Sequence, residues 1–120
     1  MKVKNWGGNL SFTPAEIKNP NSESEIIEIV QQANNENKKI RIKGSGHSWT
    51  RLIPTDSILV SLDNYQGIIS IDKAKNLVTV KAGTKLKLLG KLLENQGLAM
   101  ENLGDIDVQS IAGALNTGTH

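Results

Sequence analysis

A short glycine-rich turn in the first half of the chain carries residue types suited to binding a charged ligand. Residues 43–48 have the sequence KGSGHS, in which Gly44 and Gly46 allow the backbone to turn tightly and approach a ligand closely. Exposed N–H groups in such a turn form an anion-binding concavity, and Arg41 and Lys43 add positive charge beside it. The pattern indicates either a pyrophosphate site or an ordinary glycine-rich turn beside a solvated basic strand.

The turn differs from two well-known phosphate-binding loops. A Rossmann loop needs glycine at its sixth position, where this chain has Trp49, and the Gly-Lys-Ser/Thr of a Walker A loop is absent. His47 in the same turn could act as acid, base, ligand or nucleophile, or fill a structural role. No metal site is expected, because His47 and His120 are far apart and the chain has no cysteine.

A second segment rich in glycine and small hydroxyl residues covers residues 110–120, SIAGALNTGTH. With the first turn it would offer N–H and hydroxyl donors to a long ligand that carries a diphosphate and several polar edges. A dinucleotide fits that description better than a metal ion or a peptide does. The alternative is a loop of small residues packed beneath a sheet.

Composition narrows the class of protein. The chain has 120 residues, of which 38% are hydrophobic and 22% charged, and its net charge of +2 is too balanced for a dedicated nucleic-acid binder. Aromatic residues make up only 3%, which argues against a stacking platform for single strands. We expect no secretory signal and no membrane span, because no apolar run approaches the roughly 20 residues that a span needs. The absence of cysteine is compatible with a cytoplasmic location.

Hydrophobic periodicity predicts two helices and several strands. A capping box at Ser22 and Glu25 starts a helix over 23–35. Alternation predicts a strand over 39–43, with Ile40 and Ile42 facing a core, and the apolar run at 58–62 predicts a short buried strand. Runs at 68–71 and 77–81 predict a hairpin. A second helix opens at 82–84, carries an apolar stripe and stops at Gly97, and the segment after 98 is too broken for a long helix. The predicted fold is α+β, a mixed β-sheet layer covered by two helices.

The two glycine-rich segments, at 44–48 and 113–120, together resemble the flavin domain of the vanillyl-alcohol oxidase superfamily. The sequences NWGGN at 5–9 and LG at 103–104 strengthen the likeness. The chain is most similar to the sugar-1,4-lactone oxidases (L-gulonolactone and D-arabinono-1,4-lactone oxidases) and to alditol oxidase. The resemblance implies that residues 1–120 are the N-terminal part, or first subdomain, of a PCMH-type FAD-binding domain, truncated before the second flavin subdomain and the substrate domain.

The resemblance also implies which residues bind FAD. In the first turn, which would grip the pyrophosphate, they are Ile42, Lys43, Gly44, Ser45, Gly46, His47 and Ser48. Beyond it they are Gly104, Asp105, Ser110, Gly113, Thr117, Gly118, Thr119 and His120. His47 stands where many relatives attach the flavin covalently, so it is the expected attachment residue. Relatives often carry serine at the position of Asp105.

The implied activity is oxidation of a CH–OH group in a sugar lactone or polyol, with oxygen as acceptor and hydrogen peroxide as product. Gly104 occupies the implied oxygen-access position and favours an oxidase, with cytochrome-coupled dehydrogenation as the alternative. No catalytic residue is expected within 1–120, so we expect no turnover from this part alone. The competing function is an inactive interaction module that self-associates through surfaces exposed by truncation. Peripheral membrane association leaves no trace in this segment.

Overall fold

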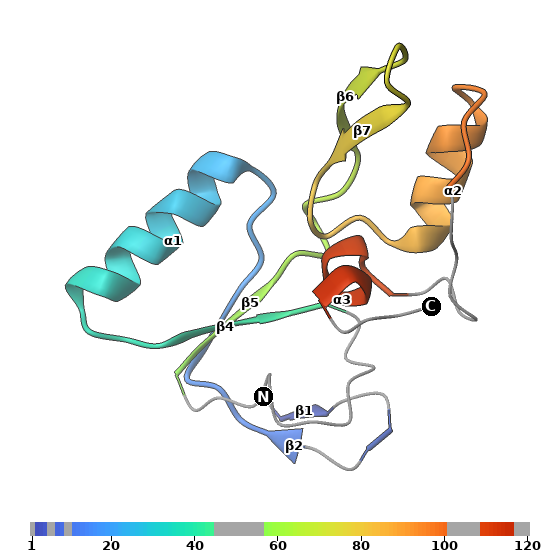
Figure 1. The fold of residues 1–120 in the computed structure, drawn as a ribbon. Coiled ribbons are helices and arrows are strands. Elements are labelled where there is room, and N and C mark those ends of the chain that lie inside the picture. Colours follow the sequence, from blue (N-terminus) through green and yellow to red (C-terminus); the bar gives the residue numbers. More distant parts are fainter. Residues whose placement is uncertain (1, 5–6, 9–10, 45–56, 101–108, 117–120) are drawn as a thin grey trace.

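The structure is a computed structural model that describes residues 2–4, 7–8, 11–44, 57–100 and 109–116. In Figure 1, α1 lies on one side of the molecule, a hairpin and α2 lie on the other, and α3 lies between them. The described strands form three sheets, with the orders β1-β2, β3-β5-β4 and β6-β7. The predicted α+β class is therefore confirmed.

The three-stranded sheet is parallel and places the first glycine turn. It contains β3 (Glu16–Lys18), β5 (Ile58–Ser61) and β4 (Ile40–Lys43), and β5 lies in the middle. All four residues of β5 are buried, as expected of a central strand with both faces covered. The predicted strands at 39–43 and 58–62 are thus confirmed to within one residue.

Helix α1 (Glu23–Asn35) connects β3 to β4 and covers one face of this sheet. The Ser22 side chain accepts a hydrogen bond from the N–H of Glu25 at 3.2 Å, which confirms the predicted cap. The helix ends at Asn35, and beyond it Asn37 adopts a left-handed conformation (φ 53°) while the N–H of Lys38 donates to the carbonyl oxygen of Ala33 at 2.8 Å. Ala33 packs with three residues of the β5 region, Ile58, Val60 and Leu62.

The prediction that Ile42 faces a core is wrong. Ile40 packs against the cluster beneath α1, but Ile42, two residues on, is 53% exposed. Of the two, only Ile40 is among the residues packed on that cluster, so the apolar side chain of Ile42 stays uncovered near the carboxyl end of β4.

The second half of the described chain has its own core. Strands β6 (Ile68–Asp72) and β7 (Leu77–Val80) form the predicted antiparallel hairpin. Helix α2 (Leu86–Glu94) buries the predicted stripe of Leu86, Leu89 and Leu93 against residues of that hairpin. Gly97 (φ 70°) ends the helix as predicted: the N–H of Leu98 donates to the carbonyl oxygen of Leu93 at 2.8 Å.

Three details of the predicted architecture need correction. The two helices cover different sheets instead of one, because α1 packs on the parallel sheet and α2 on the hairpin. Helix α2 begins at Leu86, since residues 82–84 form a turn with other partners. Residues 110–116, expected to be a loop, include the short helix α3 (Ile111–Asn116).

A small strand pair completes the described fold. Strands β1 (Val3–Lys4) and β2 (Ser11–Phe12), which the sequence did not suggest, form a small antiparallel pair. None of the described helices is long and apolar enough to cross a bilayer. The described residues also contain no group of three or more metal-ligating side chains.

Candidate cofactor-binding site

Five of the fifteen residues expected to bind the cofactor lie in the described part of the chain: Ile42, Lys43, Gly44, Ser110 and Gly113. The other ten lie outside it: Ser45, Gly46, His47, Ser48, Gly104, Asp105, Thr117, Gly118, Thr119 and His120. The described part of the candidate site therefore consists of residues 42–44 at the start of the first glycine-rich segment, together with Ser110 and Gly113 at the start of the second.

Gly44 directly follows β4, at the carboxyl end of the parallel sheet. Ligands of open parallel sheets bind at this edge, beyond the ends of the strands. Lys43 pairs with Ser61 in the last register position of β4 and β5, so Gly44 leaves the sheet beside the end of its central strand. Arg41 and Lys43 share the sheet face opposite Ile40, because side chains alternate along a strand. The edge thus carries positive charge, and the exposed Ile42 adds apolar surface to it.

The two glycine-rich segments meet at Gly44 and Ser110. A Cβ atom added to Gly44 would lie 2.5 Å from Ser110 Oγ and 3.5 Å from Ser110 Cβ. Gly44 is not among the residues with positive φ, so close approach, and not backbone conformation, demands glycine here. A Cβ added to Gly113 would lie 3.0 Å from the same Oγ. The side chain of Ser110 is therefore held between two glycines from distant parts of the sequence.

Ser110 also caps α3. Its Oγ accepts a hydrogen bond from the N–H of Gly113 at 3.3 Å, and its carbonyl oxygen accepts from Ala114 at 2.9 Å. Only 4% of Ser110 is exposed. The hydroxyl keeps its own proton, which it is able to donate.

The amide groups at the start of α3 already have partners inside the protein. The N–H of Ile111 donates to the carbonyl oxygen of Thr84 at 2.8 Å, and that of Ala112 donates to Ala82 at 3.3 Å. With the amide of Gly113 bound to Ser110, no N–H of residues 111–113 is left for a ligand. The expectation of backbone donors for a diphosphate is therefore wrong for residues 111–113, and residues 117–120 lie outside the described part.

Residues 82–86 hold α3 in place, whereas the sequence indicated only that a helix opens at 82–84. A Cβ added to Gly83 would collide with the backbone carbonyl of Leu62 and lie 2.7 Å from the carbonyl oxygen of Tyr65. Gly83 thus packs directly against the chain that leaves β5. The sequence signal for this role is a glycine followed by a threonine just before an apolar helix. An ordinary helix start has the same pattern, so the signal does not distinguish the two.

Among the described residues, the ionisable groups whose pKa is shifted lie at the amino end of the parallel sheet, away from Gly44. Hydrogen bonds from Lys18 and Lys38 lower the pKa of Glu16, and hydrogen bonds to Glu36 and Glu16 raise the pKa of Lys38. Each ion pair measures 3.2 Å. They link β3 to the end of α1 at the amino edge of the sheet, opposite Gly44, so they belong to the scaffold.

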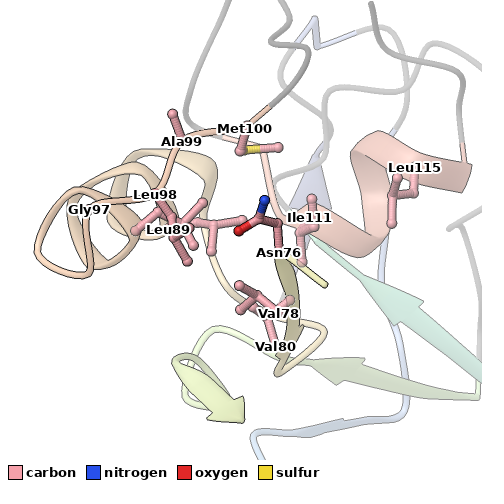
Figure 2. A pocket seen from close by; sticks show the side chains of 11 residues that line it. Asn76, Val78, Val80, Leu89, Gly97, Leu98, Ala99, Met100, Ile111 and Leu115 are labelled. Carbon is pink, nitrogen blue, oxygen red and sulfur yellow. The ribbon is translucent and has the colours of Figure 1, made fainter. Parts of the chain in front are cut away.

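A separate apolar groove of about 760 Å³ lies between the hairpin, α2 and α3. Figure 2 shows Val78 and Val80 on one side, Leu89 and Leu98 on another, and Ile111 and Leu115 from α3. None of the five described residues expected to bind the cofactor lines this groove. It is thus distinct from the junction of Gly44 and Ser110.

Comparison with known proteins relates this chain to flavoenzymes. The chain is 40% identical over 116 residues to the L-gulono-1,4-lactone dehydrogenase of Mycobacterium tuberculosis, covering 97% of this chain and 27% of that protein. It is 41% identical over 117 residues to a putative D-arabinono-1,4-lactone oxidase of Neurospora crassa, covering 98% of this chain and 21% of the relative. The predicted resemblance to sugar-lactone oxidases is confirmed. The chain spans about a quarter of the length of these relatives.

The fold is also shared with a solved structure, that of a cholesterol oxidase. The crystal structure of cholesterol oxidase from B. sterolicum superposes with a TM-score of 0.82 at 23% identity, covering 99% of this chain and 24% of that one. This likeness confirms the expected fold, that of the first part of a PCMH-type domain. A family model described as "FAD binding domain" matches residues 14–120. The chain therefore belongs to the FAD-binding domain family, and its cofactor is FAD.

Proposed function

We propose that this chain is the N-terminal, FAD-binding part of an oxidoreductase that oxidises a CH–OH group of a sugar lactone or polyol. The names of two relatives support the substrate class, because both act on 1,4-lactones. One is called a dehydrogenase and the other an oxidase. We propose oxygen as the acceptor and hydrogen peroxide as the product, on the basis of glycine at position 104.

The contact between Gly44 and Ser110 is the observation that carries this proposal. A dinucleotide needs two loops that converge, and the described ends of the two glycine-rich segments lie against each other. Bound FAD would supply the two-electron acceptor for the reaction. Gly44 would let the backbone approach the pyrophosphate, while Lys43 and Arg41 would offset its negative charge.

The finer assignments remain proposals about residues outside the described part. We assign covalent attachment of the flavin to His47 and further cofactor contacts to the other predicted residues of both segments. The substrate-binding and proton-abstracting residues would belong to other parts of the whole protein. The cytoplasmic location stays a prediction, and peripheral membrane association stays its alternative.

Binding of FAD to the purified chain tests the proposal. Titration should quench flavin fluorescence, and Gly44→Ala should weaken binding, because the new methyl group displaces Ser110. Gly90→Ala is the matched control: this glycine is exposed in α2, and a Cβ there meets no atom of the described residues within 4 Å. Equal FAD affinity in the two variants would argue against a cofactor site at this junction.

An interaction module without catalysis is the second candidate, and exposed apolar surface favours it. Leu115 is 74% exposed beside the groove, and Leu77 in the hairpin is 60% exposed. A two-stranded hairpin also leaves strand edges available for pairing. Size-exclusion chromatography with and without FAD separates the two functions, since a module would self-associate identically in both conditions.

A further inference from the structure

Thr84 is completely buried at the base of the hairpin although its side chain is polar. Its hydroxyl donates to the carbonyl oxygen of Lys81 at 2.6 Å and accepts from the N–H of Gly67 at 3.0 Å. Gly67 precedes β6 and Lys81 follows β7, and these two residues are themselves joined by a backbone hydrogen bond of 2.9 Å. One hydroxyl group therefore fixes Thr84 to both ends of the hairpin.

The backbone around Thr84 holds the residues on both sides of Ser110. The carbonyl oxygen of Thr84 accepts from Ile111 at 2.8 Å, and the N–H of Leu86 donates to the carbonyl oxygen of Gln109 at 2.9 Å. Lys85 and Ser110 form an isolated β-bridge between these two bonds. The position of Ser110 is thus set by the segment that Thr84 anchors.

The same segment is fixed to the parallel sheet. Gly83 lies against the backbone carbonyls of Leu62 and Tyr65, and Ala82 packs on the core cluster beneath α1. The segment therefore connects β5, the hairpin and the start of α3. Because Gly44 leaves the sheet beside β5, this connection determines how closely Ser110 approaches it.

We propose that Thr84 is a positioning residue for the cofactor site, acting through Ser110, which it holds against Gly44. The inference rests on the proposed function only in taking FAD as the ligand. Loss of the hydroxyl would leave the partly buried N–H of Gly67 without this acceptor. The segment would then shift, and Ser110 would move away from Gly44.

The test uses Thr84→Val, which keeps the shape and removes the hydroxyl, and Thr84→Ser, which keeps the hydroxyl. Thr79→Val makes the same chemical change at an exposed position of β7 and serves as the control. Amide hydrogen exchange of Ile111 is measured without FAD, and FAD affinity is measured by fluorescence. We expect Thr84→Val to speed the exchange and weaken FAD binding, each about tenfold, because one buried hydrogen bond is lost. Thr84→Ser should restore both, and Thr79→Val should change neither.

The outcomes separate this inference from the proposed function. Unchanged exchange of Ile111 in Thr84→Val overturns the inference, and so does faster exchange with unaltered FAD affinity. If the whole protein carries no FAD, the proposed function fails, while exchange in this chain still decides whether Thr84 controls the start of α3. If Thr84→Val does not fold, the inference is tested in the parent chain by how the exchange of the Gly67 and Ile111 amides depends on denaturant. The amides of Gly67 and Ile111 should open with the same free energy, and different values would overturn the inference.

Discussion

The close approach of Gly44 to Ser110 makes a double-mutant cycle the sharpest test of the structure. Gly44→Ala alone places a methyl carbon 2.5 Å from Ser110 Oγ, well inside van der Waals contact. Because Ser110 is buried and caps α3, its side chain has little freedom to move aside. We expect Gly44→Ala to reduce the free energy of unfolding by about 1–3 kcal/mol, the usual cost of overpacking a filled site.

Ser110→Ala removes the Oγ atom with which the new methyl group at position 44 would collide. Ser110→Ala alone should cost about 1 kcal/mol, because α3 loses its cap. In that background the described residue nearest to the new methyl group of Gly44→Ala is residue 110, whose Cβ lies at an ordinary 3.5 Å. The second substitution should then be nearly neutral, or stabilising by up to about 1 kcal/mol, because alanine restricts the unfolded chain more than glycine does.

Urea unfolding followed by circular dichroism measures all four proteins of this cycle. The double variant should be more stable than the sum of the single effects predicts, by about 1–3 kcal/mol. The effects of substitutions at distant, independent sites on the free energy of unfolding add to within about 0.5 kcal/mol. Additivity at that level would mean that the two residues do not touch, and it would refute the convergence of the two segments.

Three further predictions concern other residues. Gly83→Ala should lower the free energy of unfolding by several kcal/mol, because its methyl group meets backbone that cannot rotate away. Gly90→Ala should leave that free energy unchanged or raise it by up to about 1 kcal/mol. Equal melting temperatures of the two variants would contradict this. An NMR titration should place the pKa of Glu16 below its ordinary value of 4.5, and Lys18→Ala should raise it. Since a lowered pKa stabilises the fold above the unfolded value, this contribution should be lost as pH falls below 4.5, and an unshifted titration would contradict it. In the whole protein, His47→Ala should abolish acid-stable flavin, and flavin that stays with the precipitated variant would refute covalent attachment at that residue.

Elements with strong local signals were predictable from the sequence. The cap at Ser22, the leucine stripe of α2 and the glycine at its end are all encoded within a few residues of the structure they form. The hairpin was also predictable, because two β-rich runs flank a short polar turn. Its Asn76 adopts the left-handed conformation that asparagine tolerates well.

Elements that depend on distant partners were not predictable. Strand β3 has a single apolar residue, Ile17, and exists because it pairs with β5. Helix α3 is only six residues long, and its first amides bind Thr84 and Ala82, far away in the sequence. Isolated helices of that length are unstable in water, so local propensity gives no signal for it.

The candidate site also has a part that was predictable from local sequence and a part that depends on distant partners. Glycines in two segments pointed to a site made by convergence, and the contact at Gly44 supports that interpretation. The role of residues 82–86 escaped sequence reasoning, because it lies in backbone hydrogen bonds that side-chain types do not reveal. The same bonds explain why the amides of α3 are not donors for a ligand.

Titration of the isotope-labelled chain with FAD, followed by amide chemical shifts, shows whether the two glycine-rich segments form one cofactor site. The amides of Gly44 and Ser110 belong to distant parts of the sequence, yet they should shift together with a single dissociation constant. Amides at the amino edge of the parallel sheet, such as that of Glu16, should stay unchanged. Binding that leaves both Gly44 and Ser110 unperturbed would contradict a cofactor site at their junction.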